Sequence, residues 1–313
     1  MSRTSILGAA YELGEHETGH REAPGFAAKL DRYEMIDDAA IWGWGRFYRS
    51  GRGRAGLAVA SARRTLARAG RTGGDIDAVL LCATEFEPDV DSHARYSREV
   101  LGELGIERAF VAGMTLGRCN TLLSAVHVAD RLVASGSYHD VLVVAGDLIT
   151  DEDRRFQQFA LFSDAAASAV VTASPGELAI VASSSAMDVA GLEAAGRFSG
   201  RLGRETADAI TRASGVAPGE VSVVLSPNVF RPLVRMSEGQ SGFRPHQLYL
   251  DNIADRGHCF SADPLVNLVD LRESGRTRPG DHVLLTSSVP GSCVRVLTEV
   301  LDFHCDDRGV HHA

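Results

Sequence analysis

Two stretches that resemble each other decide the fold. CNTLLSAVHVADRLVASG spans residues 119–136, and CFSADPLVNLVDLRESG spans residues 259–275. Each is a helix-like run, and each leads into a buried, strand-like run: VLVVAG at 141–146 after the first and HVLLTSS at 282–288 after the second. Because such self-similarity at a fixed spacing is the mark of a repeated structural unit, the pattern indicates a duplicated βαβ-containing fold.

The spacing within the two stretches supports the same interpretation. Cys119 precedes Asp130 by 11 residues, as Cys259 precedes Asp270. A second pair of matching stretches, LARAGRTGGDIDAVLLCAT from residue 66 and ITRASGVAPGEVSVVLSPN from residue 210, occurs in the same order. Chance similarity between generic α/β stretches is the alternative, but two ordered matches favour duplication. We therefore expect the Cys119 turn to face the His258–Cys259 turn across a pseudo-twofold axis, in a site formed by both halves.

Helix-like and strand-like segments alternate along the chain, which predicts an α/β protein with mostly parallel or mixed sheets. The predicted helices cover 55–69, 94–104, 120–135, 202–214 and 264–274, and the predicted strands cover 79–81, 141–144, 169–172, 221–225 and 283–285. The stretch SPGEL at 174–178 is the best candidate for a joint, and we place an amino-terminal half at 1–174 and a carboxyl-terminal half at 175–313.

Composition excludes several classes of protein. A net charge of −9 argues against nucleic acid as the main partner, because phosphates are neutralised by a clustered basic surface. Five cysteines, an odd number, argue against a disulfide scaffold. No apolar run approaches the roughly 20 residues needed to span a bilayer, and the amino terminus does not resemble a secretory signal. These features predict a cytoplasmic protein without a membrane partner.

Cys119 is the candidate nucleophile. It stands where the turn Leu116–Arg118 gives way to an apolar helix. The positive end of a helix dipole favours the thiolate, which is the form required for covalent acyl transfer. Taken alone the signal is weak, since a small buried cysteine near a helix start usually serves packing.

From Gly56 onward the chain resembles the β-ketoacyl-acyl-carrier-protein synthase III family of the thiolase superfamily. The segments that carry the resemblance are DIDAVLLCAT (75–84), the stretch from Cys119, VLVVAGD (141–147), FSDAAASAVV (162–171), DNIADRGHCFSAD (251–263) and RTRPGDHVLLTSS (276–288). The resemblance implies a thiolase fold, in which two pseudo-duplicated α/β halves form a five-layered α-β-α-β-α core. It also implies a homodimer, a thioester of coenzyme A or of the phosphopantetheine arm of an acyl carrier protein as substrate, and no permanently bound cofactor. Cys119 falls at the family's nucleophile position.

The sequence departs from the family at two positions. Members usually carry a histidine in a Pro-His-Gln-like motif and an asparagine in a later Gly-Asn motif, which together stabilise the enolate formed in decarboxylation. Here the first position reads LSPNVF, giving Asn228, or Pro227 in an alternative alignment, and the second reads RGHC, giving His258. RPHQ at 244–247 looks similar to the first motif, but its place in the chain makes it a poor candidate.

His258 and Asp263 complete the predicted catalytic set. An imidazole with an ordinary pKa near 6.5 suits a general base acting on Cys119, and Asp263 would hold its tautomer. The pattern GHCFSAD (257–263) resembles a divergent branch of the family in natural-product pathways, whose members use Cys (or Ser), His and Asp and move acyl groups. The alternatives are that Asp263 is a helix cap before Pro264 and that His258 is a core histidine.

The oxyanion hole requires backbone N–H donors. Cys119 supplies one candidate. The resemblance places the second in SSVPGSC (287–293), where Gly291 is the plausible donor because Pro290 has no N–H.

Four arginines in RFYRSGRGR match a region where the family touches the phosphates of coenzyme A or phosphopantetheine: Arg46, Arg49, Arg52 and Arg54. Guanidinium forks suit phosphate oxygens, and a solvated charged loop is the alternative. We interpret Cys82, Cys293 and Cys305 as packing or incidental residues. His304 and the tail histidines His311 and His312 have no spacing typical of a metal site, so no metal is predicted.

These observations predict an acyltransferase that moves an acyl group from a coenzyme A or acyl-carrier-protein thioester, through a Cys119 acyl-enzyme, to a small-molecule O, N or S acceptor in secondary metabolism. The first alternative is a decarboxylating condensing enzyme in which Asn228 and His258 exchange roles. The second is a non-catalytic partner in a heterodimer with an active synthase. A degradative thiolase fits less well, because no second catalytic cysteine motif is found.

Overall fold

The computed structural model describes residues 3–192 and 199–302, and Cys305 and the tail histidines lie outside them. Its main feature is a nine-stranded sheet in the order β5-β4-β6-β7-β1-β8-β11-β10-β9. These strands are β1 (Ser5–Leu13), β4 (Ala78–Cys82), β5 (Phe110–Met114), β6 (Asp140–Asp147), β7 (Ala165–Thr172), β8 (Leu178–Met187), β9 (Val223–Leu225), β10 (His282–Val289) and β11 (Ser292–Val300). A two-stranded sheet pairs β2 (His16–Gly19) with β3 (Arg46–Arg49).

The two halves repeat one strand arrangement. Order β4-β6-β7-β1 in the first half matches β9-β10-β11-β8 in the second, and corresponding pairs have the same direction: β4–β6 and β9–β10 are parallel, and the others are antiparallel. The duplicated halves are thus present in the topology. The boundary at residue 174 falls between β7 and β8 and stays a prediction.

The register of the repeat differs from the one that the cysteines suggested. β10 begins at residue 282 and β6 at residue 140, a separation of 142 residues. Position 119 therefore corresponds to Ser261, and the matching of Cys119 with Cys259 was wrong by two residues. The helix starts Thr121 and Asp263 are 142 residues apart as well, so helix and strand give the same correspondence.

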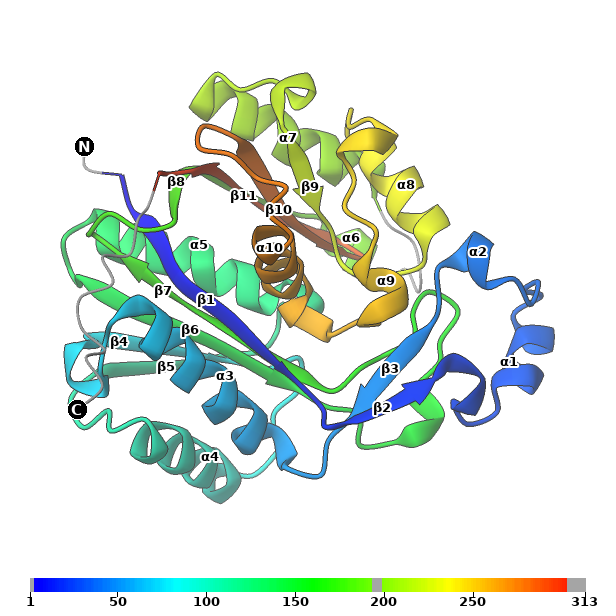
Figure 1. Ribbon diagram of the computed structural model, residues 1–313, viewed down its shortest axis with the longest axis horizontal. Coiled ribbons are helices and arrows are strands. Elements are labelled where there is room, and N and C mark those ends of the chain that lie inside the picture. The colour runs from blue at the N-terminus through cyan, green and yellow to red at the C-terminus, as the bar shows by residue number, and fades with distance from the viewer. Residues whose placement is uncertain (1–2, 193–198, 303–313) are drawn as a thin grey trace.

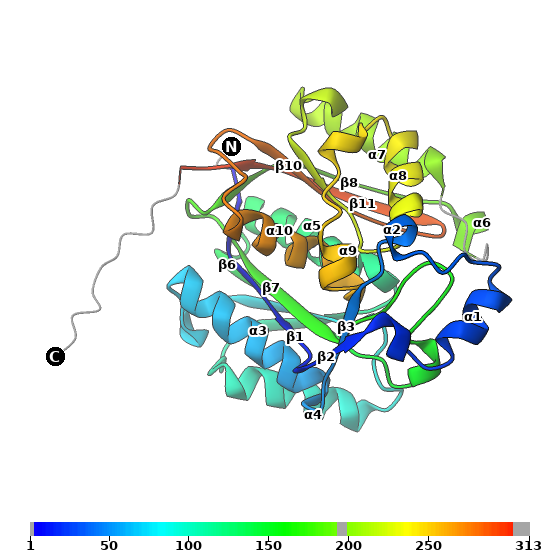
Figure 2. The same cartoon turned by 45° about the vertical axis from the view of Figure 1, so that its right-hand side comes forward.

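The two halves of the sheet and three layers of helices form five layers, with one helix layer between the halves and one outside each half (Figures 1 and 2). In the middle, α5 (Thr121–Ala134) and α10 (Asp263–Glu273) pack together with inward side chains of both halves in one continuous core. Two further cores lie outside: α3 (Gly53–Ala69) and α4 (Val90–Glu103) cover the first half, and α7 (Gly200–Ser214) covers the second. Alternate residues of one strand serve different layers, as Val79 and Leu80 do, because side chains alternate across a sheet.

Shorter helices lie around the sheet: α1 (Phe26–Arg32), α2 (Ala39–Trp42), α6 (Val189–Leu192), α8 (Arg231–Gln240) and α9 (Asn252–Asp255). A cluster of aromatic side chains that includes Phe26, Trp44 and Phe156 fixes the β2–β3 region. No helix within residues 3–192 or 199–302 has the length and apolar character needed to cross a membrane.

Candidate active site

The Cys119 turn joins β5 to α5. The chain turns sharply at Arg118, which has a positive φ of 51° and is the first residue of the 3-10 turn Arg118–Asn120. Helix α5 begins directly after this turn, at Thr121. The Arg118 N–H and the Thr121 hydroxyl both donate to the Thr115 carbonyl, at 3.1 and 3.2 Å. Ser287 Oγ donates to the Cys119 carbonyl at 2.9 Å. Cys119 is therefore held from both halves, with its thiol partly exposed.

The His258 loop is fixed just as firmly. Gly257 has a φ of 66°, and a Cβ there would lie 2.8 Å from the Leu161 carbonyl oxygen. The His258 N–H donates to that same carbonyl at 2.8 Å, and the Ser163 N–H donates to the His258 carbonyl at 2.9 Å. The imidazole is 1% exposed and lies 4.8 Å, between ring centroids, from Phe162. The backbone therefore sets the position of the ring before any partner is considered.

The structure brings Cys119, His258 and Asp263 together. His258 Nε2 lies 3.4 Å from Cys119 Sγ, and His258 Nδ1 makes a short hydrogen bond to Asp263 Oδ2. The carboxylate also accepts two backbone N–H groups, from Asn228 at 2.6 Å on Oδ2 and from Cys259 at 2.7 Å on Oδ1. These three bonds orient the fully buried carboxylate toward the ring. The arrangement joins a thiol, an imidazole and a carboxylate in series, which is able to generate a thiolate–imidazolium pair.

The electrostatics correct one expectation. We expected His258 to keep an ordinary pKa, and it does not. Burial lowers the pKa of the imidazole, but the charges of Asp263 and then Cys119, with their hydrogen bonds, outweigh burial and raise it to about 10. His258 is therefore protonated near neutral pH, and loss of the Cys119 negative charge would lower its pKa.

Asp263 is not a helix cap. It is the first residue of α10, and its side chain bonds to groups outside the helix. The alternative interpretation of this residue was therefore wrong.

Asn228 reaches the site through its backbone. Its amide N–H bonds to Asp263, whereas its side-chain Oδ1 accepts a bond of 3.0 Å from Asn267 Nδ2. Asn267 also donates to the Ser226 carbonyl at 2.8 Å and accepts from Asn252 at 2.9 Å. Asn252 and Asn267 were not predicted from the sequence. The signal in the sequence was an asparagine, Asn267, within the otherwise apolar start of the predicted helix 264–274, and the structure shows it fully buried.

The turn that carries Gly291 lies beside the Cys119 turn. The residues flanking Cys119 contact it directly, since Arg118 donates to the Pro290 carbonyl and Asn120 Nδ2 donates to Ser292 Oγ at 3.1 Å. Gly291 has a φ of 77° in the tight connection between β10 and β11, and its carbonyl accepts the Asp188 N–H at 2.8 Å. Its neighbourhood is thus as expected, and its use as an oxyanion donor stays a prediction.

Each of the four arginines has a carboxylate partner: Arg46 with Glu17 (3.0 Å), Arg49 with Glu152 (3.0 Å), Arg52 with Glu12 (2.7 Å) and Arg54 with Glu87 (3.4 Å). The first three belong to β3 and the turn that follows it. A phosphate would have to compete with these carboxylates, and phosphate binding here stays a prediction.

Other residues singled out from the sequence lie apart from this chemistry. Cys82, Cys259 and Cys293 are buried, and burial raises the pKa of the Cys82 and Cys259 thiols, which keeps them protonated. His246 is exposed on a 3-10 turn. Within the part of the chain that the structure describes, no three His, Cys, Asp or Glu side chains are grouped to hold a metal.

Comparison with known proteins finds similarity to one family. The model of the family 3-oxoacyl-[acyl-carrier-protein] synthase III matches residues 115–188, which include Cys119. A β-ketoacyl-[acyl-carrier-protein] synthase III of Gloeobacter violaceus is 28% identical over 263 residues, covering 73% of this chain and 78% of that protein. These matches support a synthase III-like protein of the thiolase superfamily. A mycobacterial synthase III of Mycobacterium marinum is 24% identical over 264 residues, covering 74% of this chain and 76% of that protein.

Solved structures of synthase III-like proteins share the fold. A protein described as ChlB3, an acyltransferase, gives a TM-score of 0.82 at 18% identity, covering 96% of this chain and 98% of that one. The synthase III of Aquifex aeolicus gives 0.77 at 18% identity (95% and 99%), and OleA of Xanthomonas campestris gives 0.76 at 18% identity (95% and 98%). The predicted thiolase fold is confirmed. Family and fold together support a thiolase-type acyl-transfer or condensing enzyme.

Proposed function

We propose that this synthase III-like protein is an acyltransferase that works through a thioester on Cys119. The observation that carries the proposal is the series Cys119 Sγ, His258 Nε2 at 3.4 Å, and Asp263 bonded to His258 Nδ1. A thiol with a base within reach and a third group that orients the base is the arrangement required for nucleophilic acyl transfer.

In the first step, the Cys119 thiolate attacks the carbonyl carbon of a coenzyme A or acyl-carrier-protein thioester. The tetrahedral intermediate collapses with cleavage of the donor C–S bond, and the leaving thiolate takes the proton of the His258 imidazolium. The Cys119 N–H, with Gly291 as the second proposed donor, stabilises the oxyanion. The products are an acyl-enzyme and a free donor thiol.

The second step follows from the electrostatics of the site. Acylation removes the negative charge of Cys119, which is one of the causes that raise the pKa of His258. The pKa of the ring therefore falls, and neutral His258 accepts a proton from the hydroxyl, amine or thiol of the acceptor as that group attacks the acyl carbon. Cys119 leaves as a thiolate beside the new imidazolium, and the starting pair is restored.

The pairing of His258 is the reason to favour transfer over decarboxylative condensation. Condensation requires two side-chain donors on a thioester enolate. At the first position Asn228 still offers a donor, because its Nδ2 is buried without a hydrogen bond while its Oδ1 accepts from Asn267. The second position, His258, is paired with Asp263 and Cys119. The names of the curated relatives, which are synthases, keep condensation as the second candidate.

The proposed assembly is a cytoplasmic homodimer. The nine-stranded sheet ends at β5, and within the described residues no strand pairs with its outer edge. Phe110 is 50% exposed on β5, and Leu116 just beyond it is 97% exposed. An unprotected apolar edge is a template for a second strand, and pairing with the same edge of another copy would extend the sheet across a twofold axis.

Intact-mass spectrometry of the protein with a panel of acyl thioesters tests the proposal. We expect an adduct of acyl mass in the wild type and in Cys293→Ala, and none in Cys119→Ala. Adding hydroxyl, amine or thiol acceptors should discharge it. An adduct that survives in Cys119→Ala contradicts the assignment of the nucleophile. Release of carbon dioxide from malonyl thioesters in step with product would establish condensation instead.

A further inference from the structure

Asp147 is a buried acidic residue that takes no part in the proposed reaction. It ends β6, a strand whose residues are all buried, and it is itself 3% exposed. Burial raises the pKa of its carboxyl group, although hydrogen bonds from Thr84 and Ser261 and the charge of Arg54 act to lower it. Because a buried carboxyl group is costly unless it is well bonded, the partners of Asp147 are the guide to its role.

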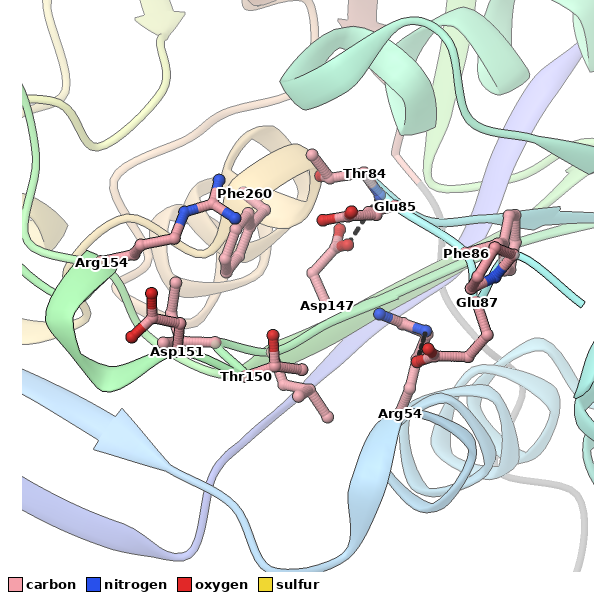
Figure 3. A pocket seen from close by; sticks show the side chains of 13 residues that line it. Arg54, Thr84, Glu85, Phe86, Glu87, Asp147, Thr150, Asp151, Arg154 and Phe260 are labelled. Carbon is pink, nitrogen blue, oxygen red and sulfur yellow. Dashed lines mark hydrogen bonds and ion pairs between the residues drawn. The ribbon is translucent and has the colours of Figure 1, made fainter.

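One oxygen of Asp147 is connected to the nucleophile turn. The Thr84 N–H donates to Asp147 Oδ1 at 2.7 Å, a bond that Figure 3 shows. The Thr84 carbonyl in turn accepts from the Thr115 hydroxyl at 3.3 Å. Thr115 is the residue whose own carbonyl anchors the turn that carries Cys119. Two bonded residues therefore link Asp147 to that turn.

The other oxygen of Asp147 is bonded to the segment that carries the base. Ser261 is fully buried, and its Oγ donates to Asp147 Oδ2 at 3.3 Å. Ser261 is the middle residue of the 3-10 turn Phe260–Ala262, which lies between His258 and Asp263 in the chain. One carboxyl group thus connects the two segments that have to meet for the triad to form.

The turn that contains Ser261 is strained. Phe260 has a φ of 55°, in the left-handed region that a bulky side chain rarely adopts. Its ring stacks on the His258 ring, with 6.0 Å between centroids and an interplanar angle of 26°. Strained backbone of this kind persists only where its surroundings fix it. Relaxation of the turn would displace the His258 ring, and a misplacement of about 1 Å at a reacting group can slow a reaction about 100-fold.

We propose that Asp147 is a positioning residue for the proposed reaction. Through its bond to Ser261 it holds the strained turn that precedes α10. The turn then keeps His258 Nε2 within reach of Cys119 Sγ. The inference rests on the proposed function, because it takes Cys119 and His258 as the reacting pair, and it adds a residue outside the triad on which that pair depends.

Alkylation of Cys119 by iodoacetamide, followed by peptide mass spectrometry, tests the proposal without an acyl donor. Ser261→Ala removes only the hydroxyl that bonds to Asp147. We expect alkylation at pH 7 to slow by about tenfold or more, because the thiol loses its aligned imidazole. The deficit should shrink as the pH rises above about 8.5, where a thiol ionises without a partner.

Ser168→Ala is the matched control. Ser168 is also fully buried, and its hydroxyl bonds to the hydroxyls of Ser61 and Thr65, at 2.7 Å each, between β7 and α3. Its loss should lower stability in urea about as much as Ser261→Ala does, while the alkylation rate stays at the wild-type value at every pH. The comparison separates the loss of a buried hydroxyl from the loss of alignment.

Variants of Asp147 show whether the bond to Ser261 is the cause. Asp147→Ala should slow alkylation at least as much as Ser261→Ala. The double variant should lose no more than Asp147→Ala alone, because the two substitutions remove the same bond. Asp147→Asn, whose amide can bond to both Thr84 and Ser261, should bring the rate back to within a few-fold of the wild type.

The outcomes separate this inference from the proposed function. Three results would each overturn the role of Asp147: alkylation of Ser261→Ala at the wild-type rate, an equal deficit at pH 7 and pH 10, or losses that multiply in the double variant. These results count whether or not thioesters acylate Cys119. Absence of any acyl adduct in the wild type contradicts the acyl-enzyme alone, because the alkylation profile still reports the alignment of the pair.

Discussion

At the scale of single residues, the site depends on where charges are placed around one imidazole. His258 is buried among Phe162 and Phe260, an environment that by itself favours the neutral ring. Asp263 and Cys119 reverse that preference. Acylation of Cys119 removes one of these two charges and so lowers the pKa of the ring, the direction that the two proton transfers of the proposed reaction require.

Asp263→Asn tests the first of these charges. Loss of the carboxylate should bring the pKa of His258 below its value of about 10 and slow acyl transfer by up to about 10⁴-fold, the scale seen when the carboxylate of a catalytic triad is replaced by an amide. NMR titration of the imidazole and the rate of adduct discharge would measure the two effects. Asp251→Asn, which removes an exposed partner of Arg276, is the control. An unchanged titration would show that Asp263 does not set the protonation of His258.

The raised pKa of His258 also predicts how stability depends on pH. Its folded-state value of about 10 lies above the ordinary 6.5, so the stabilisation is fully present below pH 6.5 and is lost as pH rises toward about 10. The difference in free energy of unfolding between wild type and His258→Gln should therefore shrink over that range. Urea denaturation at several pH values measures it, with the exposed His246→Gln as control. A difference that is constant or grows with pH would contradict the ion pair.

At the scale of elements, the loop between α9 and α10 positions two of the three triad residues, His258 and Asp263. It carries His258, bonds to the segment at Leu161–Ser163, and leads through a 3-10 turn into α10. Gly257 makes this close approach possible, because only a residue without Cβ fits against the Leu161 carbonyl.

Two glycines of nearly equal φ allow the cost of a steric contact to be measured apart from the cost of backbone strain. Gly257 (66°) faces the Leu161 oxygen, whereas Gly275 (67°) has no atom within 4 Å of the Cβ position. Both alanine variants carry the strain of the left-handed region, about 1–2 kcal/mol, and Gly257→Ala should lose about 1–3 kcal/mol more from the forced contact. Urea unfolding and the rate of Cys119 acylation measure the difference. Equal losses with unimpaired acylation would mean that the loop relaxes without cost.

Many of the helices and strands could be predicted from the sequence. All five predicted helices and all five predicted strands lie where the structure has helices or strands. β1, β2, β3, β5, β8 and β11 were not predicted. β8 has the sequence LAIVASSSAM, and its three serines do not favour a strand. The strand forms because β8 pairs with β11, which is distant in the sequence. The Cys119–His258–Asp263 contact followed from motif and duplication together. The side-chain hydrogen bonds among Asn228, Asn252 and Asn267 could not be predicted. They depend on which residues the loops bring together, and residue spacing does not encode that.

At the scale of the whole molecule, the outer edge of β5 should decide the state of assembly. Val111→Lys places a charge on the edge strand, where it would oppose pairing with a second copy. We expect sedimentation to show a dimer for the wild type and for Met236→Lys, which alters an exposed residue of α8, and a monomer for Val111→Lys. A wild-type monomer, or a dimer in Val111→Lys, would rule out assembly through this edge.

The place of β11 in the sheet bears on how the protein is made. β11 comes last in the described chain, yet it lies between β8 and β10. Its first residue, Ser292, contacts Asn120, and Pro290 in the turn before it contacts Arg118. A nascent chain on the ribosome exposes Cys119 long before this strand emerges, because domains form from the amino end as synthesis proceeds. Premature termination ahead of residue 292 would release a polypeptide that has all three triad residues but no strand to close the sheet around them. Synthesis thus leaves the thiol without its finished surroundings until β11 has emerged.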